Sequence, residues 1–123
     1  MSKKILAVGN CGFDHGNLQE FASRHFNAEV TPAPDANEAK RVLGQDSYDL
    51  VLVNRKFDRD GGDGIELIRQ IKSDPAFSGT SAMLLSNYPE YQQQAVAAGA
   101  AQGFGKAELG SQNAISAIQA ALA

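Results

Sequence analysis

The sequence has one cysteine among its 123 residues, no tryptophan and no excess of basic residues. Because Cys11 has no second cysteine to pair with, no disulfide within the chain can stabilise the fold. The formal net charge of −3 disfavours partners that are recruited by bulk electrostatics, since nucleic acids and anionic membranes both favour a basic surface. We therefore expect neither a nucleic acid nor a membrane among its partners.

Long apolar runs are absent as well. Lys, Asp, Glu or Gln interrupts every run well short of the roughly 18 apolar residues that a membrane span requires. The first run, Ile5 to Val8, is also too short for the apolar core of a signal peptide. These absences lead us to expect a soluble protein of the cytoplasm. Hydrophobic residues still make up 43% of the chain, enough for one domain, residues 1–123, with its own core.

Short apolar runs alternate along the chain with segments whose apolar residues recur at helical spacing. The runs predict five strands, at residues 5–8, 29–31, 49–53, 82–85 and 102–105. The other segments predict five helices, at residues 17–26, 35–44, 63–74, 89–98 and around 114–122. Pro32 and Pro34 are expected to end the second strand, and Pro75 lies just past the end of the third helix.

The order of these elements repeats strand and helix five times. Leu50 to Val53 are all apolar, which is typical of a central strand that is covered on both faces. Since crossovers between parallel strands are right-handed, the pattern predicts an α/β domain with a parallel sheet between two layers of helices. In such sheets, ligands bind beyond the carboxyl ends of the strands. Those ends are expected at residues 9–11, 32–33, 54–55, 86–87 and 105–106.

Several segments resemble conserved parts of a known signalling family. Asp49–Asn54 is similar to a strand that ends in a phosphoacceptor aspartate, and Asp63–Ile71 is similar to the helix that follows it. Met83–Ser86 is similar to a strand that ends in a switch Ser or Thr, and Ala97–Ala100 followed by Lys106 resembles a Gly-Ala segment and its lysine. Together they resemble the receiver domain of bacterial two-component response regulators. The resemblance implies a flavodoxin-like, doubly wound sheet of five parallel strands in the order 2-1-3-4-5, with five helices on two faces.

The positions that perform phosphoryl chemistry in that family hold neutral residues here. In the family, two acidic residues after the first strand and the phosphoacceptor aspartate together hold a magnesium ion. The corresponding residues are Gly9, Asn10 and Asn54. Without carboxylates Mg²⁺ affinity collapses, and an amide offers no anionic nucleophile to a phosphodonor. We therefore predict no bound metal, no cofactor and no catalytic residue, and hence a binding domain rather than an enzyme.

The positions that transmit the phosphorylation signal also differ. Gly103 stands three residues before Lys106, where the family usually has an aromatic side chain that moves inward. Phe104 is expected to pack in the core rather than to replace this aromatic, because adjacent residues of a strand point to opposite faces. The loop of residues 55–64 is about two residues longer than usual and lacks the family's Met-Pro pair.

Ser86 and Lys106 match family positions that contact the phosphoryl group. We expect them to remain as hydrogen-bonded pocket residues. The ammonium group of Lys106 then lacks its usual partners, and a carboxylate from the longer loop, Asp58, Asp60 or Asp63, could supply one.

These departures predict a pseudo-receiver that takes part in signal transduction through phosphorylation-independent contact with a protein partner. Tyr88, Tyr91 and Phe104 are the candidate partner surface, although at least one of them is equally compatible with core packing. The small-residue face of the last helix suits either packing on the sheet or a homodimer.

Two alternatives remain open from the sequence. The first is a small-ligand or ion site at the altered strand-end pocket of Asn10, Asn54, Ser86 and Lys106. The second is a working phosphorelay receiver that uses another acceptor, such as Asp58.

Overall fold

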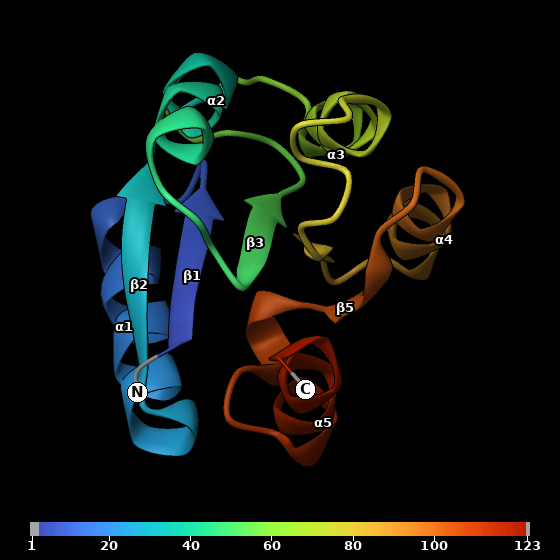
Figure 1. The fold of residues 1–123 in the computed structure, drawn as a ribbon. Helices are drawn as coiled ribbons and strands as arrows, with labels where there is room; N and C mark the ends of the chain where they lie inside the picture. The colour runs from blue at the N-terminus through green and yellow to red at the C-terminus, as the bar shows by residue number, and fades with distance from the viewer. Residues whose placement is uncertain (1–2, 123) are drawn as a thin grey trace.

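A five-stranded parallel sheet in the order β2-β1-β3-β4-β5 forms the centre of the computed structural model, which describes residues 3–122 (Figure 1). The predicted α/β class, strand order and five helices are confirmed. The strands are β1 (Lys3–Val8), β2 (Ala28–Ala33), β3 (Leu50–Asn54), β4 (Ala82–Leu85) and β5 (Ala101–Phe104). The α-helices are α1 (Gly12–Phe26), α2 (Ala36–Gln45), α3 (Gly64–Ser73), α4 (Pro89–Ala97) and α5 (Gln112–Leu122), and a short 3-10 helix, η1 (Lys106–Glu108), follows β5.

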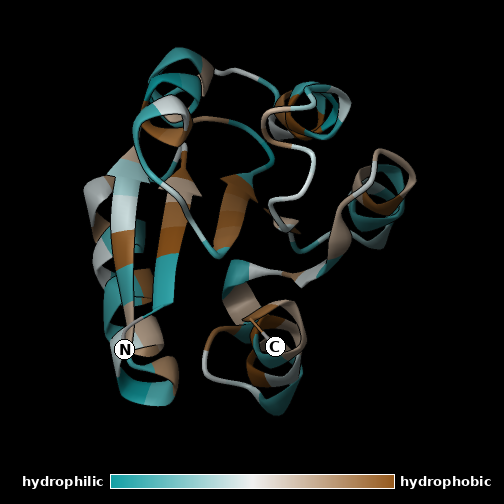
Figure 2. Cartoon of the chain, in the orientation of Figure 1, coloured by the Kyte–Doolittle hydropathy of each residue, from teal (hydrophilic) through white to brown (hydrophobic). Residues whose placement is uncertain are grey.

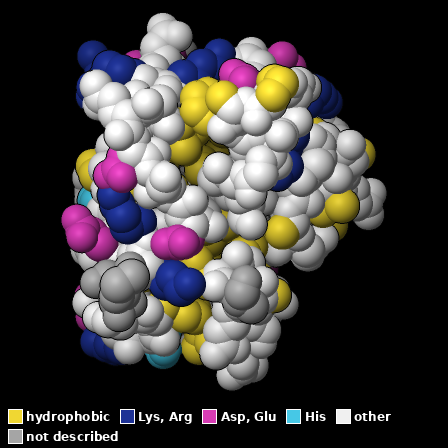
Figure 3. All heavy atoms as spheres, in the orientation of Figure 1, with side chains coloured by type: hydrophobic (Ala, Val, Ile, Leu, Met, Phe, Trp, Pro, Cys, Tyr) yellow, Lys and Arg dark blue, Asp and Glu magenta, His cyan; other side chains and the backbone are white. Residues whose placement is uncertain are grey.

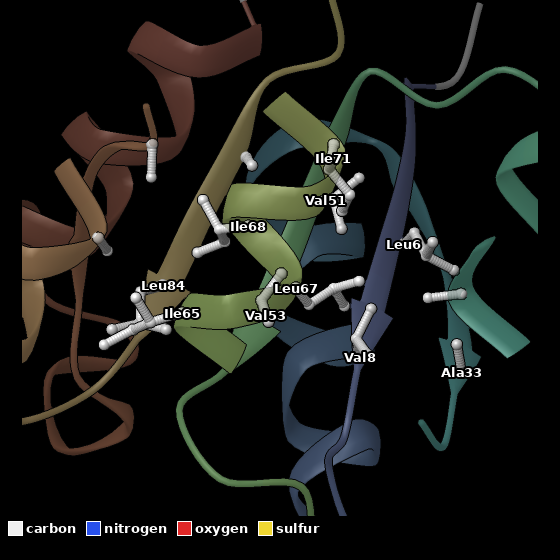
Figure 4. Packing of buried hydrophobic residues seen from close by; sticks show 14 of the residues in the cluster. Leu6, Val8, Ala33, Val51, Val53, Ile65, Leu67, Ile68, Ile71 and Leu84 are labelled. Carbon is white, nitrogen blue, oxygen red and sulfur yellow. The ribbon is translucent and has the colours of Figure 1, made fainter. Parts of the chain in front are cut away.

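Alternate residues of the central strands enter two separate apolar layers, because successive side chains of a strand point to opposite faces. On one face, Leu6, Val8, Val51 and Val53 pack against α2, α3 and α4. Figure 4 shows Val51 and Val53 beneath α3, with Val8 and Leu6 beside it on β1. On the other face, apolar residues of the same strands pack against α1 and α5. The hydropathy view in Figure 2 shows the resulting brown bands on β1 and β3. The central sheet is therefore covered on both sides, as the unbroken apolar runs predict.

Local side-chain signals set several helix ends. The Asp35 carboxylate accepts a hydrogen bond from the Glu38 amide at 2.9 Å, and Asp63 accepts one from the Ile65 amide at 3.0 Å. Both satisfy amide groups that the first turn of a helix leaves unpaired. Asn27 ends α1 in the left-handed conformation with φ 51°. These three residues therefore mark the starts of α2 and α3 and the end of α1.

Two boundaries differ from the prediction. Helix α1 begins at Gly12 rather than Asn17, because its first turn is exposed and has no buried apolar residue to mark it in the sequence. Strand β2 continues through Pro32 to Ala33 instead of ending before the proline. The Gly9 amide donates to the Ala33 carbonyl, so the backbone of Pro32 faces the free edge of the sheet, where no amide hydrogen is needed.

Within residues 3–122 no helix has both the length and the apolar character that crossing a bilayer would need. On the face drawn in Figure 3, acidic and basic side chains lie close to one another instead of forming a basic patch. The view also shows a largely uncharged surface at the lower right, over α5, which contains no Asp, Glu, Lys or Arg.

Candidate functional site

A pocket of about 430 Å³ opens at the carboxyl ends of β3 and β4. It brings together Asn54, Ser86 and Lys106, as the sequence predicts for the strand-end pocket. Its remaining lining residues are Arg55, Lys56, Leu85, Asn87, Tyr88, Glu90 and Tyr91. Asn10, the fourth residue expected there, does not line this pocket. The candidate site is thus displaced from β1 toward β4 and α4.

The amide of Asn54 at the end of β3 holds the backbone around it. Its Nδ2 donates to the Lys56 carbonyl at 2.8 Å and to the Gly9 carbonyl at 3.3 Å. A carboxylate has no hydrogen to donate to either carbonyl. The residue at this position therefore joins the ends of β3 and β1 as a structural donor.

Phe57 fills the space above Gly9, and no sequence signal singled it out. The ring is 2% exposed and belongs to the same apolar cluster as Val8 and Val53. A Cβ atom at Gly9 would collide with the ring, and Gly9 has φ +85°, a conformation that favours glycine. Gly9 and Phe57 are therefore complementary, and an apolar side chain occupies the region next to the end of β1.

The longer loop after β3 is what carries Phe57 inward. The Phe57 amide donates to the Gly62 carbonyl at 2.9 Å, and the Gly61 amide donates to the Phe57 carbonyl at 2.8 Å. The Asp58 amide donates to the Gly9 carbonyl at 2.9 Å, which fastens the loop to β1. These hydrogen bonds fold the loop back on itself and hold it against the end of β1.

Asn10 follows Gly9 and has a different environment from the one expected. Its Nδ2 and Oδ1 atoms are both buried and have no hydrogen-bond partner among the described residues. In sequence it is the second of the neutral residues at the end of β1, but its side chain makes no contact that would assign it a role in the pocket.

Lys106 pairs with a carboxylate, although not with one that the sequence suggested. Its Nζ lies 2.6 Å from Asp14 Oδ2, on the first turn of α1. The prediction that Asp58, Asp60 or Asp63 would be its partner is wrong. Asp63 caps α3, Asp60 accepts from the Gly62 amide at 2.9 Å, and Asp58 is exposed in the loop. Because the sequence predicts that α1 begins at Asn17, it does not place Asp14 on this helix.

The ion pair with Lys106 makes the stability of the fold depend on pH. The hydrogen bond from Lys106 holds the pKa of Asp14 below its ordinary value of 3.8, against the opposing effect of burial. This contribution is present above that value and is lost as the pH falls through the lowered pKa. Because both side chains are about 30% exposed, we expect Asp14→Asn to lower the free energy of unfolding at pH 7 by only about 0.5–1 kcal/mol.

Urea unfolding of the wild type and Asp14→Asn at pH 7, 5 and 3 checks this prediction. The difference between the two should shrink as the pH drops below about 4, where the unfolded chain already binds a proton at Asp14 and the folded chain still resists it. Asp58→Asn, a change at an exposed carboxylate outside any ion pair of the described residues, is the matched control and should leave stability unchanged. A constant difference at all three pH values would contradict the role of the ion pair.

Ser86 and Asn87 shape the turn between β4 and α4. Ser86 Oγ accepts a hydrogen bond from the Tyr88 amide at 3.2 Å, and Asn87 Oδ1 accepts one from the Ala107 amide at 3.2 Å. A Cβ at Gly105 would collide with Asn87. The turn is thus held against η1 by side-chain contacts that are already made within the chain.

Gly103 lies at an irregularity between β4 and β5, where Gln92 enters the sheet. Met83 pairs with Ala101 and Leu85 with Phe104, so one residue of β4 faces two of β5. Gln92 Oε1 accepts from the Gly103 amide at 3.1 Å, and Gln92 Nε2 lies 3.0 Å from the Leu84 carbonyl. Nε2 also reaches the Ser86 and Phe104 carbonyls, at 3.1 and 3.4 Å.

Gln92 is 5% exposed and is the one polar residue among residues 3–122 that is buried as a whole. Because the pairing of β4 with β5 is irregular, the Gln92 amide serves as hydrogen-bond partner for the Leu84 carbonyl and the Gly103 amide. A Cβ at Gly103 would collide with the Leu84 carbonyl. Backbone therefore closes the space at position 103, and the amide of Gln92 lies next to it.

The three aromatic residues proposed as a partner surface have different environments. Tyr88 is 59% exposed, and Tyr91 is half-buried beside it with the ring centroids 5.9 Å apart. Phe104 is 1% exposed and packs against the α1 and α5 side of the sheet. Its assignment to the partner surface is wrong, whereas the expectation that it packs in the core is confirmed.

Comparison with known proteins gives a likeness in fold. No protein-family model and no curated protein matches the sequence. A putative response regulator from Chloroflexus aurantiacus matches with a TM-score of 0.86 at 17% identity, covering 99% of this chain and 98% of that one. The signal receiver domain of a DNA-binding response regulator from Colwellia psychrerythraea has a TM-score of 0.79 at 24% identity, with 97% of both chains covered. For the chemotaxis response regulator CheY4 of Vibrio cholerae, the values are 0.77 and 19%, over 99% of this chain and 100% of that one. The protein therefore has the fold of response-regulator receiver domains.

Proposed function

We propose that this protein is a receiver-like domain of bacterial signal transduction that binds a protein partner without being phosphorylated. The observation that carries the proposal is the arrangement of Gly9, Asn54 and Phe57. Receiver domains, which the sequence resembles, have carboxylates around a magnesium ion at this end of the sheet. This chain has a glycine, a hydrogen-bonded amide and a buried ring there. None of these groups supplies the anionic oxygen ligands that Mg²⁺ requires.

A second group of contacts supports the same proposal. Receiver domains respond to phosphorylation through a Ser or Thr and an aromatic residue that change position. Here Ser86 Oγ is engaged in its own turn, Gly103 has no side chain to move, and Gln92 ties β4 to β5. These contacts favour a single arrangement of the ends of β4 and β5. A domain with one arrangement can signal by binding a partner, without a switch between two states.

Incubation with acetyl phosphate and Mg²⁺, followed by intact mass spectrometry, tests the proposal. We expect no phosphoryl gain in the wild type. We also expect none in Asn54→Asp, because one carboxylate cannot replace the missing acidic pair while Phe57 fills the adjacent space. A receiver domain with its acidic residues intact, run in parallel, shows that the donor is active. A stable gain of one phosphoryl group in the wild type would overturn the proposal, and mapping it to Asp58 would establish the alternative acceptor.

A second candidate function is the binding of a small ligand at the strand-end pocket. The observation in its favour is that Asn54, Ser86 and Lys106 line one cavity of about 430 Å³. Thermal-shift screening against metal ions and metabolites tests it, because a ligand that binds only the folded state raises the unfolding midpoint. A flat screen would leave the protein-binding function as the better account.

A further inference from the structure

The mouth of the 430 Å³ pocket is lined by cations from one segment and by aromatic rings from another. Arg55 and Lys56 come from the loop after β3, and Tyr88 and Tyr91 come from the start of α4. Leu85 lies between them at the end of β4. Two segments that are more than thirty residues apart in sequence thus form one open groove, lined by both cationic and aromatic side chains.

Arg55 is held in place by an aromatic ring rather than by a carboxylate. Its guanidinium carbon lies 4.1 Å from the centroid of the Tyr91 ring, and Nη2 lies 3.4 Å from the Tyr91 hydroxyl. Neither Arg55 nor Lys56 belongs to any of the ion pairs found within residues 3–122. A guanidinium stacked in this way keeps a planar set of donors, which matches the two oxygens of a carboxylate.

The charges around the groove favour an anionic occupant. Lys106 is paired with Asp14, so its charge is balanced at the far wall. Glu90 is the one carboxylate that lines the groove, against two cations without an ion-pair partner, although the whole chain has a formal net charge of −3. The local excess of positive charge is thus opposite in sign to the charge of the molecule.

The rim of the groove favours a protein segment over a small ion. Tyr88 is one of the most exposed large hydrophobic residues described, and its ring stands edge-to-face on Tyr91. An exposed tyrosine beside an arginine is the composition that recurs at the energetic centres of protein interfaces. A small anion would leave Tyr88 uncovered, whereas a peptide can place an apolar side chain on it.

We propose that this groove binds an acidic side chain of the partner protein, with its carboxylate at Arg55 and Lys56 and an adjacent apolar side chain on Tyr88. The proposal rests on the proposed function, because it assumes a protein partner. It specifies the chemistry of that partner as a segment with Asp or Glu next to an apolar residue.

Selection of a random displayed peptide library on the full chain tests the proposal. We expect the selected peptides to be enriched in Asp or Glu beside an apolar residue. In solution, amidating that acid should weaken binding about tenfold, and Arg55→Ala should weaken it by a similar factor. The two changes together should cost less than the sum of their separate effects, because both remove the contact between Arg55 and the carboxylate. Arg55→Lys, which keeps the charge but loses the planar donors, should have an intermediate effect.

Lys40→Ala is the matched control, because Lys40 is an exposed cation on α2, away from the groove. It should leave peptide affinity unchanged, and thermal melts of all variants check that the fold is intact. A selection without acidic enrichment overturns the proposal, including one that returns no peptide. So do additive effects of Arg55→Ala and amidation, or free glutamate binding as tightly as the peptides. These failures leave the phosphodonor experiment untouched, and a phosphoryl gain there would remove the proposed function independently.

Discussion

Replacing Phe57 with alanine is expected to lower the free energy of unfolding by about 3–5 kcal/mol. The ring is 2% exposed and packs within the cluster of Val8, Val53 and Ile65. Its removal takes away apolar burial and leaves a cavity that the glycine at position 9 cannot fill. Urea unfolding followed by circular dichroism measures the change as a lower midpoint with little change in slope.

Phe13→Ala provides the matched control for this prediction. Phe13 is 78% exposed on the first turn of α1, so its truncation should change stability by no more than about 0.5 kcal/mol. If Phe57→Ala were as mild as Phe13→Ala, the loop ring would not be part of the core. The proposal that Phe57 takes the space of a metal site next to Gly9 would then have no energetic support.

The burial of the Phe57 ring explains why position 9 is a glycine. An aspartate there would need a positive φ and would have to displace the ring from the core. The neutral residue and the lengthened loop therefore belong to one structural solution. Magnesium binding here would require several simultaneous changes, in β1, at Asn54 and in the loop.

Features that depend on local sequence could be predicted well. The apolar run Leu50 to Val53 indicates a central strand, and that strand lies in the middle of the sheet. Asp35 and Asp63 are effective helix signals because a short side chain reaches the free amides of the next turn without help from distant residues. The resemblance then supplied the strand order, which periodicity alone does not determine.

Features that depend on contacts between distant segments could not be predicted. Asp14 and Lys106 are separated by 92 positions and meet only because α1 begins five residues earlier than expected. Phe57 lies in a loop rich in charge and glycine, where sequence alone suggests solvent exposure. Gly9, with no side chain, was the available hint that something packs against it.

Gln92 is the structural residue near the site with the weakest sequence signal. It stands in a run of three glutamines, Gln92 to Gln94, of which only the first is buried. Nothing in the run distinguishes the three, because the choice depends on which face of α4 meets the sheet. Gly103 is the more visible half of the pair, since a glycine inside a strand often marks a bulge or a close approach.

Gln92→Leu is therefore expected to lower the free energy of unfolding by about 3 kcal/mol, although leucine is similar in size to glutamine and more hydrophobic. It leaves the Gly103 amide and the Leu84 carbonyl buried without their partner, and each such group costs about 1–3 kcal/mol. Urea unfolding measures the total. Hydrogen exchange should also show faster exchange at the Gly103 amide than at amides of β1, because the change loosens β5 first.

Gln94→Leu makes the same substitution on the exposed side of α4 and should change stability by no more than about 0.5 kcal/mol. Equal effects of the two variants would show that the Gln92 contacts contribute nothing beyond helix propensity. If Gln92→Leu is strongly destabilising while Gln94→Leu is neutral, the amide acts as a fixed connection between β4, β5 and α4. Such a connection would hold the surface next to Tyr88 and Tyr91 in one arrangement, as the proposed binding without phosphorylation requires.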